Sequence, residues 1–217
     1  FDQSLASLTP EDFIEKILVE KLNILNLFIG NDFKFGKNRQ GNVKLLKEKS
    51  LIYNFNVNVI EQVKSKKSSE VLSSSLVRKN IQEGKFKNVS SILGRNWCMD
   101  GKVVPGDKRA SKMNFPTANI IPPDLIYPKK GVYIVKGLYK GDIYNGIANF
   151  GERPTVRGKK LLLEVHLFNF SKNIYGKNLT VEFLAFIRDE KKFENFDKLI
   201  QQIRKDIQVA KNYHLNN

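Results

Sequence analysis

The stretch LLLEVHLFNF, residues 161–170, places one acidic side chain inside an apolar run. Side chains alternate between the two faces of a strand, so Glu164 and His166 share a face with Leu162 and Phe168. A carboxylate in such a setting has to be paired or to reach a solvated cleft. Glu164 is therefore a candidate general base at the mouth of a pocket, or a structural carboxylate bonded to an arginine or to an amide at a strand edge. The pattern leaves both interpretations open.

The stretch MNFPTANI, residues 113–120, brings a hydroxyl and a carboxamide close together beside apolar residues. Pro116 stiffens the backbone and favours an extended conformation at Phe115. Thr117 and Asn119 offer neutral oxygen atoms of the kind that suit magnesium or a phosphate-bound water. The alternative is an ordinary turn whose side chains bond the backbone.

The stretch GKVVPGDKRASK precedes this motif and nearly reproduces a Walker A loop. Gly101 and Gly106 have the required spacing, but Asp107 stands where the lysine should be and no helix signal follows. These departures exclude a P-loop. A glycine-pivoted loop that carries Lys108 and Arg109 can still hold phosphates through backbone amides and charge.

The first 93 residues alternate helix and strand patterns. A helix is predicted over residues 9–22, because Thr9 can cap it and Pro10 suits its first position. Short strands are predicted over LNLFIG and FNVNVIEQV, and helices over SSSLVRKNIQEG and FKNVSSILG, which end at glycines. Such alternation is typical of an α/β domain.

Strand patterns dominate after residue 95. GVYIVKGLYKGDIYNGIANF reads as a hairpin around KGD, while LLLEVHLFNF and LTVEFLAFI read as further strands. Several short strands close together predict a small antiparallel barrel. Residues 196–213 form a helix pattern, and one apolar face of this helix is expected to pack on the barrel. That face contains Phe196, Leu199, Ile200, Ile203, Ile207 and Ala210.

The composition narrows the possible partners. The 217 residues, 41% of them hydrophobic, suffice for one large domain or two small ones and exclude global disorder. A single cysteine, Cys98, excludes an internal disulfide and a thiolate zinc site, and favours a reducing compartment, the cytoplasm. The net charge of +15 suits a phosphate or nucleic-acid binder, but the basic residues are scattered, so we expect no nucleic-acid partner.

No apolar run approaches the roughly 20 residues that span a bilayer, so we expect no membrane partner. The start, FDQSLASLTPEDF, has neither the basic nor the apolar region of a signal peptide. It also lacks a methionine and begins abruptly, so we expect a fragment. The composition predicts no particular oligomeric state.

Several motifs together resemble the bacterial riboflavin kinase module in order and spacing over residues 94–213. They are GDKRASKMNFPTANI, GVYIV, GIANFGERPT, EVHLFNF, IYGKNLTVEFLAFIRDEKKF and LIQQIRKDIQVAK. Upstream, LASLTPEDFIEKIL, IGNDFKFGKNRQGN, LSSSLVR and EGKFKNVSSILGR resemble the rear half of the FMN adenylyltransferase module of bifunctional FAD synthetases. The resemblance implies a partial α/β nucleotidyltransferase-like domain over residues 1–93 and a riboflavin kinase β-barrel with a C-terminal helix over residues 94–217.

The resemblance also implies a reaction, in which riboflavin and ATP are the partners and FMN is the product. Thr117 and Asn119 match the motif that helps to bind the magnesium of MgATP, and Glu164 matches the base that takes the proton of the riboflavin 5′-hydroxyl. FMN and FAD are then products rather than prosthetic groups. The phosphate-loop match contains Gly101, Gly106, Lys108, Arg109 and Lys112, and the flavin-cover match contains Arg188, Glu190 and Phe193.

The chain departs from the family pattern in its phosphate loop. Ala110 and Ser111 stand where the family usually has glycine and arginine, and Asn114 stands where it has glycine. Asparagine tolerates positive φ better than most residues, so Asn114 can preserve the turn. Loss of the arginine is expected to affect ATP affinity, with Arg109 or Lys112 as substitutes.

A further departure concerns the adenylyltransferase module. Neither histidine of the chain fits the histidine–x–glycine–histidine motif of that superfamily, so we expect these 217 residues to make FMN but not FAD. The matching remnants are Asn31, Asp32 and Phe33 on the flavin side, and Ser73, Ser74 and Arg78 in the nucleotide motif. The alternatives to a flavin-phosphorylating enzyme are a non-catalytic flavin-binding or regulatory remnant and a basic nucleic-acid-binding domain.

Overall fold

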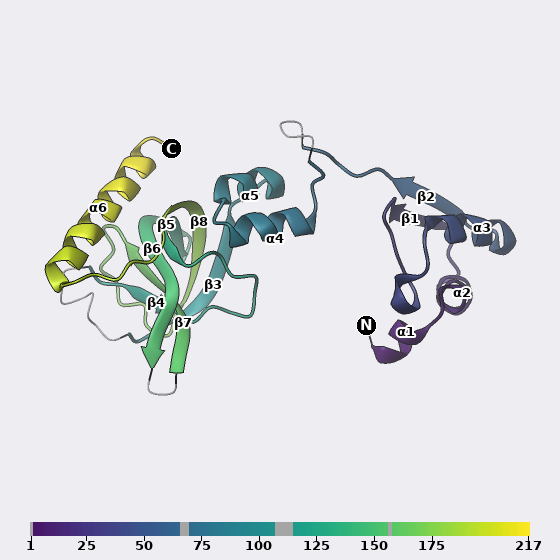
Figure 1. Cartoon of the computed structure of the whole chain (residues 1–217), viewed down its shortest axis with the longest axis horizontal. Helices are drawn as coiled ribbons and strands as arrows, with labels where there is room; N and C mark the ends of the chain where they lie inside the picture. The colour runs from purple at the N-terminus through teal and green to yellow at the C-terminus, as the bar shows by residue number, and fades with distance from the viewer. Residues whose placement is uncertain (1, 66–69, 107–114, 156–157) are drawn as a thin grey trace. The chain divides into compact units, whose positions relative to one another are not determined.

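A computed structural model describes residues 2–65, 70–106, 115–155 and 158–217 of the chain (Figure 1). The chain forms two compact units, residues 1–72 and residues 73–217. Each unit has its own hydrophobic core and is described by itself below.

The first unit is built on a short parallel pair of strands. β1 (Asn26–Gly30) pairs with β2 (Asn56–Ile60), and α3 (Val43–Tyr53) makes the crossover between them. The other elements of the unit are α1 (Gln3–Ser7), α2 (Pro10–Asp12), the π-helix η1 (Phe13–Lys21) and the 3₁₀ turn η2 (Lys37–Arg39). The buried core contains Ile14, Leu18, Ile29, Phe35, Leu46 and Phe55.

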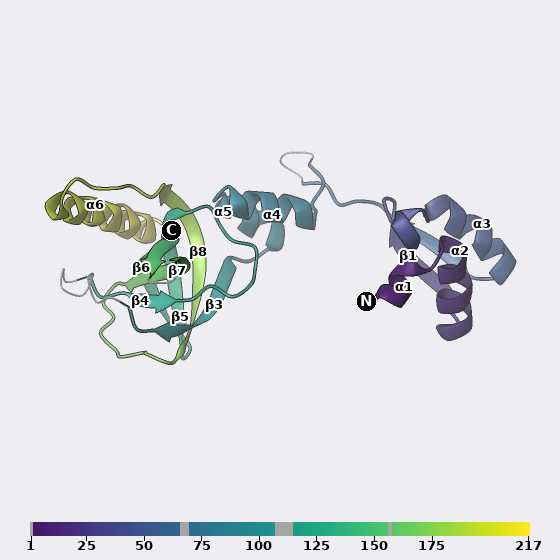
Figure 2. The same ribbon diagram turned by 60° about the horizontal axis from the view of Figure 1, so that its bottom comes forward.

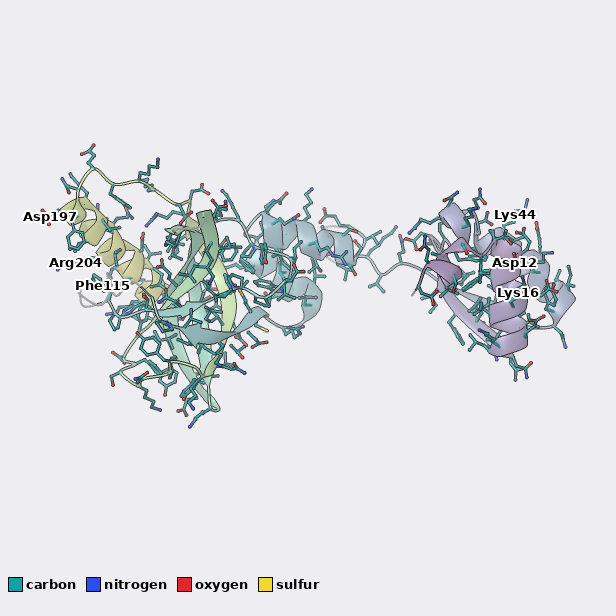
Figure 3. All side chains as sticks on the ribbon, turned by 90° about the horizontal axis from the view of Figure 1, so that it is seen from below. Asp12, Lys16, Lys44, Phe115, Asp197 and Arg204 are labelled. Atoms are coloured by element: carbon teal, nitrogen blue, oxygen red, sulfur yellow. The ribbon has the colours of Figure 1, made fainter. Side chains whose placement is uncertain are left out.

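The local signals in this unit confirm the predicted helix start. The Thr9 hydroxyl accepts a hydrogen bond from the Asp12 amide at 3.1 Å, and Pro10 occupies the first helical position. Asp12 forms an ion pair at 2.7 Å with Lys16, one turn further on (Figure 3). The motif-based prediction did not include α3, although Asn42 caps its start by accepting from the Leu45 amide.

The second unit is a closed antiparallel barrel with the strand order β3-β4-β7-β6-β5-β8 (Figure 2). Its strands are β3 (Trp97–Val104), β4 (Ala118–Ile120), β5 (Gly131–Tyr139), β6 (Asp142–Thr155), β7 (Gly158–Leu167) and β8 (Asn178–Arg188). The predicted barrel and the predicted hairpin of β5 and β6 are confirmed. Closure gives each of these described strands a partner on both sides.

Alternation along β7 decides which side chains are available to a ligand. Leu163, Val165 and Leu167 point into the barrel and are at most 5% exposed. Glu164 and His166 therefore face outward, and the prediction that they share one face of the strand is confirmed.

Two strands correct the sequence interpretation. Residues 101–104, expected to open a phosphate loop, belong to β3, where a Cβ on Gly101 would lie 2.2 Å from a methyl group of Ile120. Residues 118–120, expected to form a turn, are strand β4. β4 pairs with both β3 and β7, so tertiary pairing overrides the weak strand propensity of this short segment.

Three helices pack on the barrel. α4 (Ser74–Gln82) and α5 (Phe86–Leu93) begin and end as predicted at Ser73, Gly84 and Gly94. Both helices contribute side chains to the barrel core; the Phe86 and Phe183 rings, for example, lie 5.1 Å apart. The compact second unit therefore starts at residue 73, whereas the change in sequence pattern near residue 93 stays a prediction about the modules of the family.

The predicted C-terminal helix is α6 (Phe196–Leu215), which lies along the outer face of the barrel (Figure 1). Ala210 is buried and Ile207 packs beside it against β5 and β6. Phe196 was expected on the packed face but is 56% exposed, because it lies at the first position of the helix, ahead of that contact. Although α6 has 20 residues, neither it nor another helix of the described ranges is apolar enough to cross a membrane.

Candidate active site

A cavity of about 410 Å³ lies outside the barrel, lined by α6 and by residues of strands β5, β6 and β7. The segments 115–117 and 190–193 contribute further walls. Phe115 lies on the α6 side of the unit (Figure 3). The cavity contains apolar walls from Val132, Ile147, Leu199, Ile203 and Ile207 and a polar group around Glu164.

Strand register brings three of the polar residues into one row. Asn119 on β4 is the register partner of Glu164 on β7, and Glu164 is the register partner of Asn149 on β6. All three lie on the outer face, since their chain neighbours Ile120, Ala148 and Val165 are buried in the barrel. The row places two carboxamides on either side of one carboxylate.

Glu164 is paired with an arginine. Arg153 Nε donates to Glu164 Oε2 at 3.2 Å, and Arg153 Nη2 contacts the same oxygen. Arg153 Nη1 donates to Glu190 Oε1 at 3.1 Å. Burial opposes the charge of the guanidinium, but the hydrogen bonds and charges of Glu164 and Glu190 prevail and raise the pKa of Arg153.

Two further residues of β6 hold the Glu190 carboxylate in place. Asn149 Nδ2 donates to Glu190 Oε1 at 3.4 Å and to Glu164 Oε2 at 3.5 Å. A Cβ on Gly151 would lie 2.1 Å from Glu190 Oε1, so the carboxylate occupies space that only a glycine leaves open.

Arg188 joins the end of β8 to α6. Its Nε donates to Asp206 Oδ1 at 3.1 Å and its Nη2 to Asp206 Oδ2 at 2.7 Å, while Gln202 donates to Asp206 Oδ1 at 2.8 Å. Asp206 is 3% exposed, so this fork-shaped pair is largely withdrawn from water. The Arg188 guanidinium also lies 5.9 Å from the centre of the Phe193 ring.

The turn at Pro116 is tied to β7. His166 Nδ1 lies 2.8 Å from the Pro116 carbonyl oxygen, and since a carbonyl can only accept, Nδ1 carries the proton. The Phe115 ring packs edge-on against the His166 ring at 5.9 Å. These contacts fix the approach to Thr117, which lines the cavity.

A second cavity of about 370 Å³ shares Thr117 with the first. Its other walls come from Val103 of β3, from Pro116 and Ala118, from β7 and from residues 170–175. Asn119 is 6% exposed, and a Cβ on Gly106 would lie 2.2 Å from its amide nitrogen. The end of the 101–106 segment therefore packs directly on Asn119.

The structure does not bring all predicted site residues together. Lys108, Arg109 and Lys112 lie outside the described residues. Gly101 lies within β3, behind Ile120. Within the described ranges, no group of acidic, histidine or cysteine side chains has the arrangement of a metal site.

The adenylyltransferase remnants fall into different units. Asn31, Asp32 and Phe33 follow β1 in the first unit, and Phe33 stacks on Phe35 at 5.6 Å. Ser73, Ser74 and Arg78 belong to α4 and its cap in the second unit, where the Ser73 hydroxyl accepts from the Leu76 amide. Their roles in nucleotide or flavin binding stay predictions.

Sequence reasoning missed Arg153 and Asn149. The predicted hairpin ends with GIANF at Phe150, whereas β6 continues to Thr155. The signal was present: Asn149, Gly151 and Arg153 are spaced by two residues and share one face of a strand. The partner of that face, Glu164, becomes apparent only from the register.

Comparisons with known proteins agree with this architecture. The riboflavin kinase family model matches residues 93–214, which include the whole barrel and most of α6, and the FAD synthetase model matches residues 1–76. A Haemophilus influenzae bifunctional riboflavin kinase/FMN adenylyltransferase is 42% identical over 213 residues, which cover 97% of this chain and 68% of the relative. The Escherichia coli K12 protein of the same name is 35% identical over 214 residues, covering 98% and 68%.

A solved Streptococcus pneumoniae structure, titled a macrolide-efflux protein, has 30% identity and a TM-score of 0.83, covering 98% of this chain and 68% of that one. The chain belongs to the family of bifunctional riboflavin kinases/FMN adenylyltransferases, and its barrel is the riboflavin kinase part. This part converts riboflavin to FMN. The reactions of the family use ATP with a divalent metal, and their products are flavin nucleotides.

Proposed function

We propose that Glu164 is the general base of the kinase reaction. The riboflavin 5′-hydroxyl oxygen attacks the γ-phosphorus of ATP, its proton passes to Glu164, and the bond to the β-phosphate oxygen breaks to release ADP. The observation that carries this proposal is the position of Glu164 on the outer wall of a cavity, in one row with Asn119 and close to Thr117. Phosphoryl transfer depends mainly on such positioning and on charge stabilisation.

Riboflavin is proposed to bind in the larger cavity. Its volume, about 410 Å³, lies within the roughly 300–1,000 Å³ of small-molecule sites. The apolar walls from α6 suit a flat aromatic ring system, and Glu190 and Phe193 stand at its edge. Arg188 acts through its pair with Asp206, which fixes α6 beside β8 and so shapes the cavity.

ATP is proposed to bind on the side of the second cavity, because the two cavities meet at Thr117. Its phosphates would then reach Thr117 and Asn119 from one side while the flavin hydroxyl reaches Glu164 from the other. Of the predicted phosphate segment from Gly101 to Lys112, the part that follows β3 is proposed to hold these phosphates; its last described residue, Gly106, packs on Asn119.

The donor set at this junction fits magnesium. A hydroxyl and a carboxamide supply neutral oxygen ligands, and the lack of a carboxylate cluster among the described residues suits an ion that keeps several waters and binds mostly to phosphates. Thr117 and Asn119 would hold it. When bound, the metal would supply positive charge that offsets the negative charge developing on the transferred phosphate. We place the reaction in the cytoplasm, in agreement with the single cysteine of the chain.

A direct assay tests this function. The purified chain is incubated with riboflavin, ATP and magnesium, and flavins are separated by chromatography. FMN formation that requires both ATP and metal is the expected result. Flavin binding without turnover would instead favour a regulatory remnant, and salt-sensitive binding to generic DNA would favour a nucleic-acid-binding domain.

A further inference from the structure

Arg153 stands between two carboxylates from distant parts of the chain. On β6 it reaches Glu164 of β7 through Nε at 3.2 Å and Glu190 through Nη1 at 3.1 Å. The three side chains are 29–35% exposed, so the group is partly withdrawn from water. A planar guanidinium can hold two partners in fixed directions, which a lysine cannot do.

The residues that hold the Glu190 carboxylate also belong to β6, the strand of Arg153. Asn149 donates to both carboxylates, and Gly151 leaves room for the Glu190 carboxylate, which lies 2.1 Å from the position of a Cβ there. Asn149, Gly151 and Arg153 occupy alternate positions on the outer face of β6. One face of one strand therefore fixes Glu164 and the segment that contains Glu190.

The segment 189–195 follows β8, and its residues Glu190, Lys191 and Phe193 line the larger cavity. We propose that Arg153 is a positioning residue. By binding Glu190 it holds the segment 189–195 at the cavity, and by binding Glu164 at the same time it fixes the orientation of the Glu164 carboxylate. When Glu190 binds Nη1, the plane of the Arg153 guanidinium is fixed, and the remaining N–H groups can donate to Glu164 from one direction only. The inference rests on the proposed function of Glu164 and deepens it.

The coupling predicts non-additive kinetics. Arg153→Met removes both contacts at similar length, so kcat should fall about 10²-fold, the loss that roughly 1 Å of misplacement can cause. In a Glu164→Gln background the same substitution should change kcat less than about threefold, since residues that act as a unit are not additive. The KM for riboflavin should rise in both backgrounds, because the segment with Glu190 loses its anchor.

Matched variants separate positioning from loss of charge or fold. Lys160→Met removes a positive charge from the register partner of Arg153 on β7 and should leave kcat within about twofold. Arg153→Lys restores the charge without the fork and should recover only part of kcat. If Arg153→Met does not fold, Gly151→Ala displaces the Glu190 carboxylate and should give the same non-additivity with Glu164→Gln.

The outcomes distinguish this inference from the proposed function. Failure of the unaltered chain to form FMN would overturn the proposed function itself. An active unaltered chain in which Arg153→Met lowers kcat by the same factor with Glu164 intact and in the Glu164→Gln background would overturn the positioning role alone. Full recovery of kcat in Arg153→Lys would also overturn it, because charge without direction would then suffice.

Discussion

Glu164→Gln tests the proposed base with little change of shape. The glutamine oxygen can still accept from Arg153, but the side chain no longer takes a proton. General-base catalysis contributes typically about 10²–10⁴-fold, equivalent to roughly 2.7–5.5 kcal/mol in the barrier. We therefore expect kcat to fall by about 10²–10⁴-fold, with riboflavin affinity changed less than about threefold.

The structure also limits the effect of this substitution on stability. The side chains of Arg153 and Glu164 keep 35% and 29% of their surface exposed, so water still screens part of the attraction between them. Loss of one charge from such a pair costs at most about 1 kcal/mol, and for a chain of this size that lowers Tm by roughly 2–4 °C. The variant should stay folded at assay temperature, so its kinetics report on chemistry.

The assay is FMN formation by chromatography over a range of riboflavin concentrations, with riboflavin binding measured separately by its fluorescence. Glu182→Gln is the matched control, because Glu182 is also a half-buried strand carboxylate but accepts from Asn96 on the β3 side of the barrel, away from the cavity. The control should keep normal kcat. A kcat of Glu164→Gln within about threefold of the unaltered chain would refute the base.

The remaining predictions concern the metal, the clamp that Arg188 and Asp206 form between β8 and α6, the pH dependence of stability and the reaction product. Thr117→Val and Asn119→Ala each remove an oxygen proposed for MgATP, so a magnesium titration of turnover should shift to higher concentration; an unchanged curve in both contradicts the assignment. Asp206→Ala leaves Arg188 largely buried without its partner, so the free energy of unfolding in urea should fall by roughly 3–5 kcal/mol, and a loss below about 1 kcal/mol would count against the clamp. Burial lowers the pKa of His214, so the unfolded chain binds a proton at this residue more readily than the folded chain does. The stability that this group contributes is therefore present above about pH 6.5 and is lost as the pH falls. The free energy of unfolding of His214→Gln should fall less between pH 7 and pH 5 than that of the unaltered chain. A polypeptide of these 217 residues should stop at FMN, since no histidine–x–glycine–histidine motif is present to stabilise attack at the α-phosphate, and substantial FAD in the same chromatogram would contradict this.

The barrel was predictable because its signals are local. Alternating apolar residues and the turn KGD define β5 and β6, and the same alternation placed Glu164 on the opposite face from Leu163 and Val165. Caps and glycine stops likewise located α4 and α5. Local signals do not specify which other element a helix or strand packs against. For that reason the packing of α4 and α5 on the barrel was not predicted.

The partner of Glu164 was also beyond local reasoning. Two possibilities remained open, a base at a pocket and a carboxylate bonded to an arginine, and the structure shows that the second does not exclude the first. Arg153 holds the carboxylate, and the cavity reaches it. Spacing along β6 marks Arg153 as outward-facing, but only the register of β6 with β7 and the path of the segment after β8 bring it to Glu164 and Glu190.

The motif PTAN shows why a conflict between local propensity and fold can indicate function. Pro116, Thr117 and Asn119 suggest a turn, yet residues 118–120 form the short strand that joins β3 to β7 and closes the barrel. More apolar residues would make a better strand there, but would remove the Thr117 hydroxyl, which lines both cavities, and the Asn119 carboxamide, whose register partner is Glu164. The strand is only three residues long, which is enough to bring Asn119 into register with Glu164. His166 holds the preceding turn by a hydrogen bond to the Pro116 carbonyl oxygen. The polar composition of this segment, which lowers its strand propensity, is thus explained by the proposed role of the Thr117 and Asn119 oxygens in metal binding.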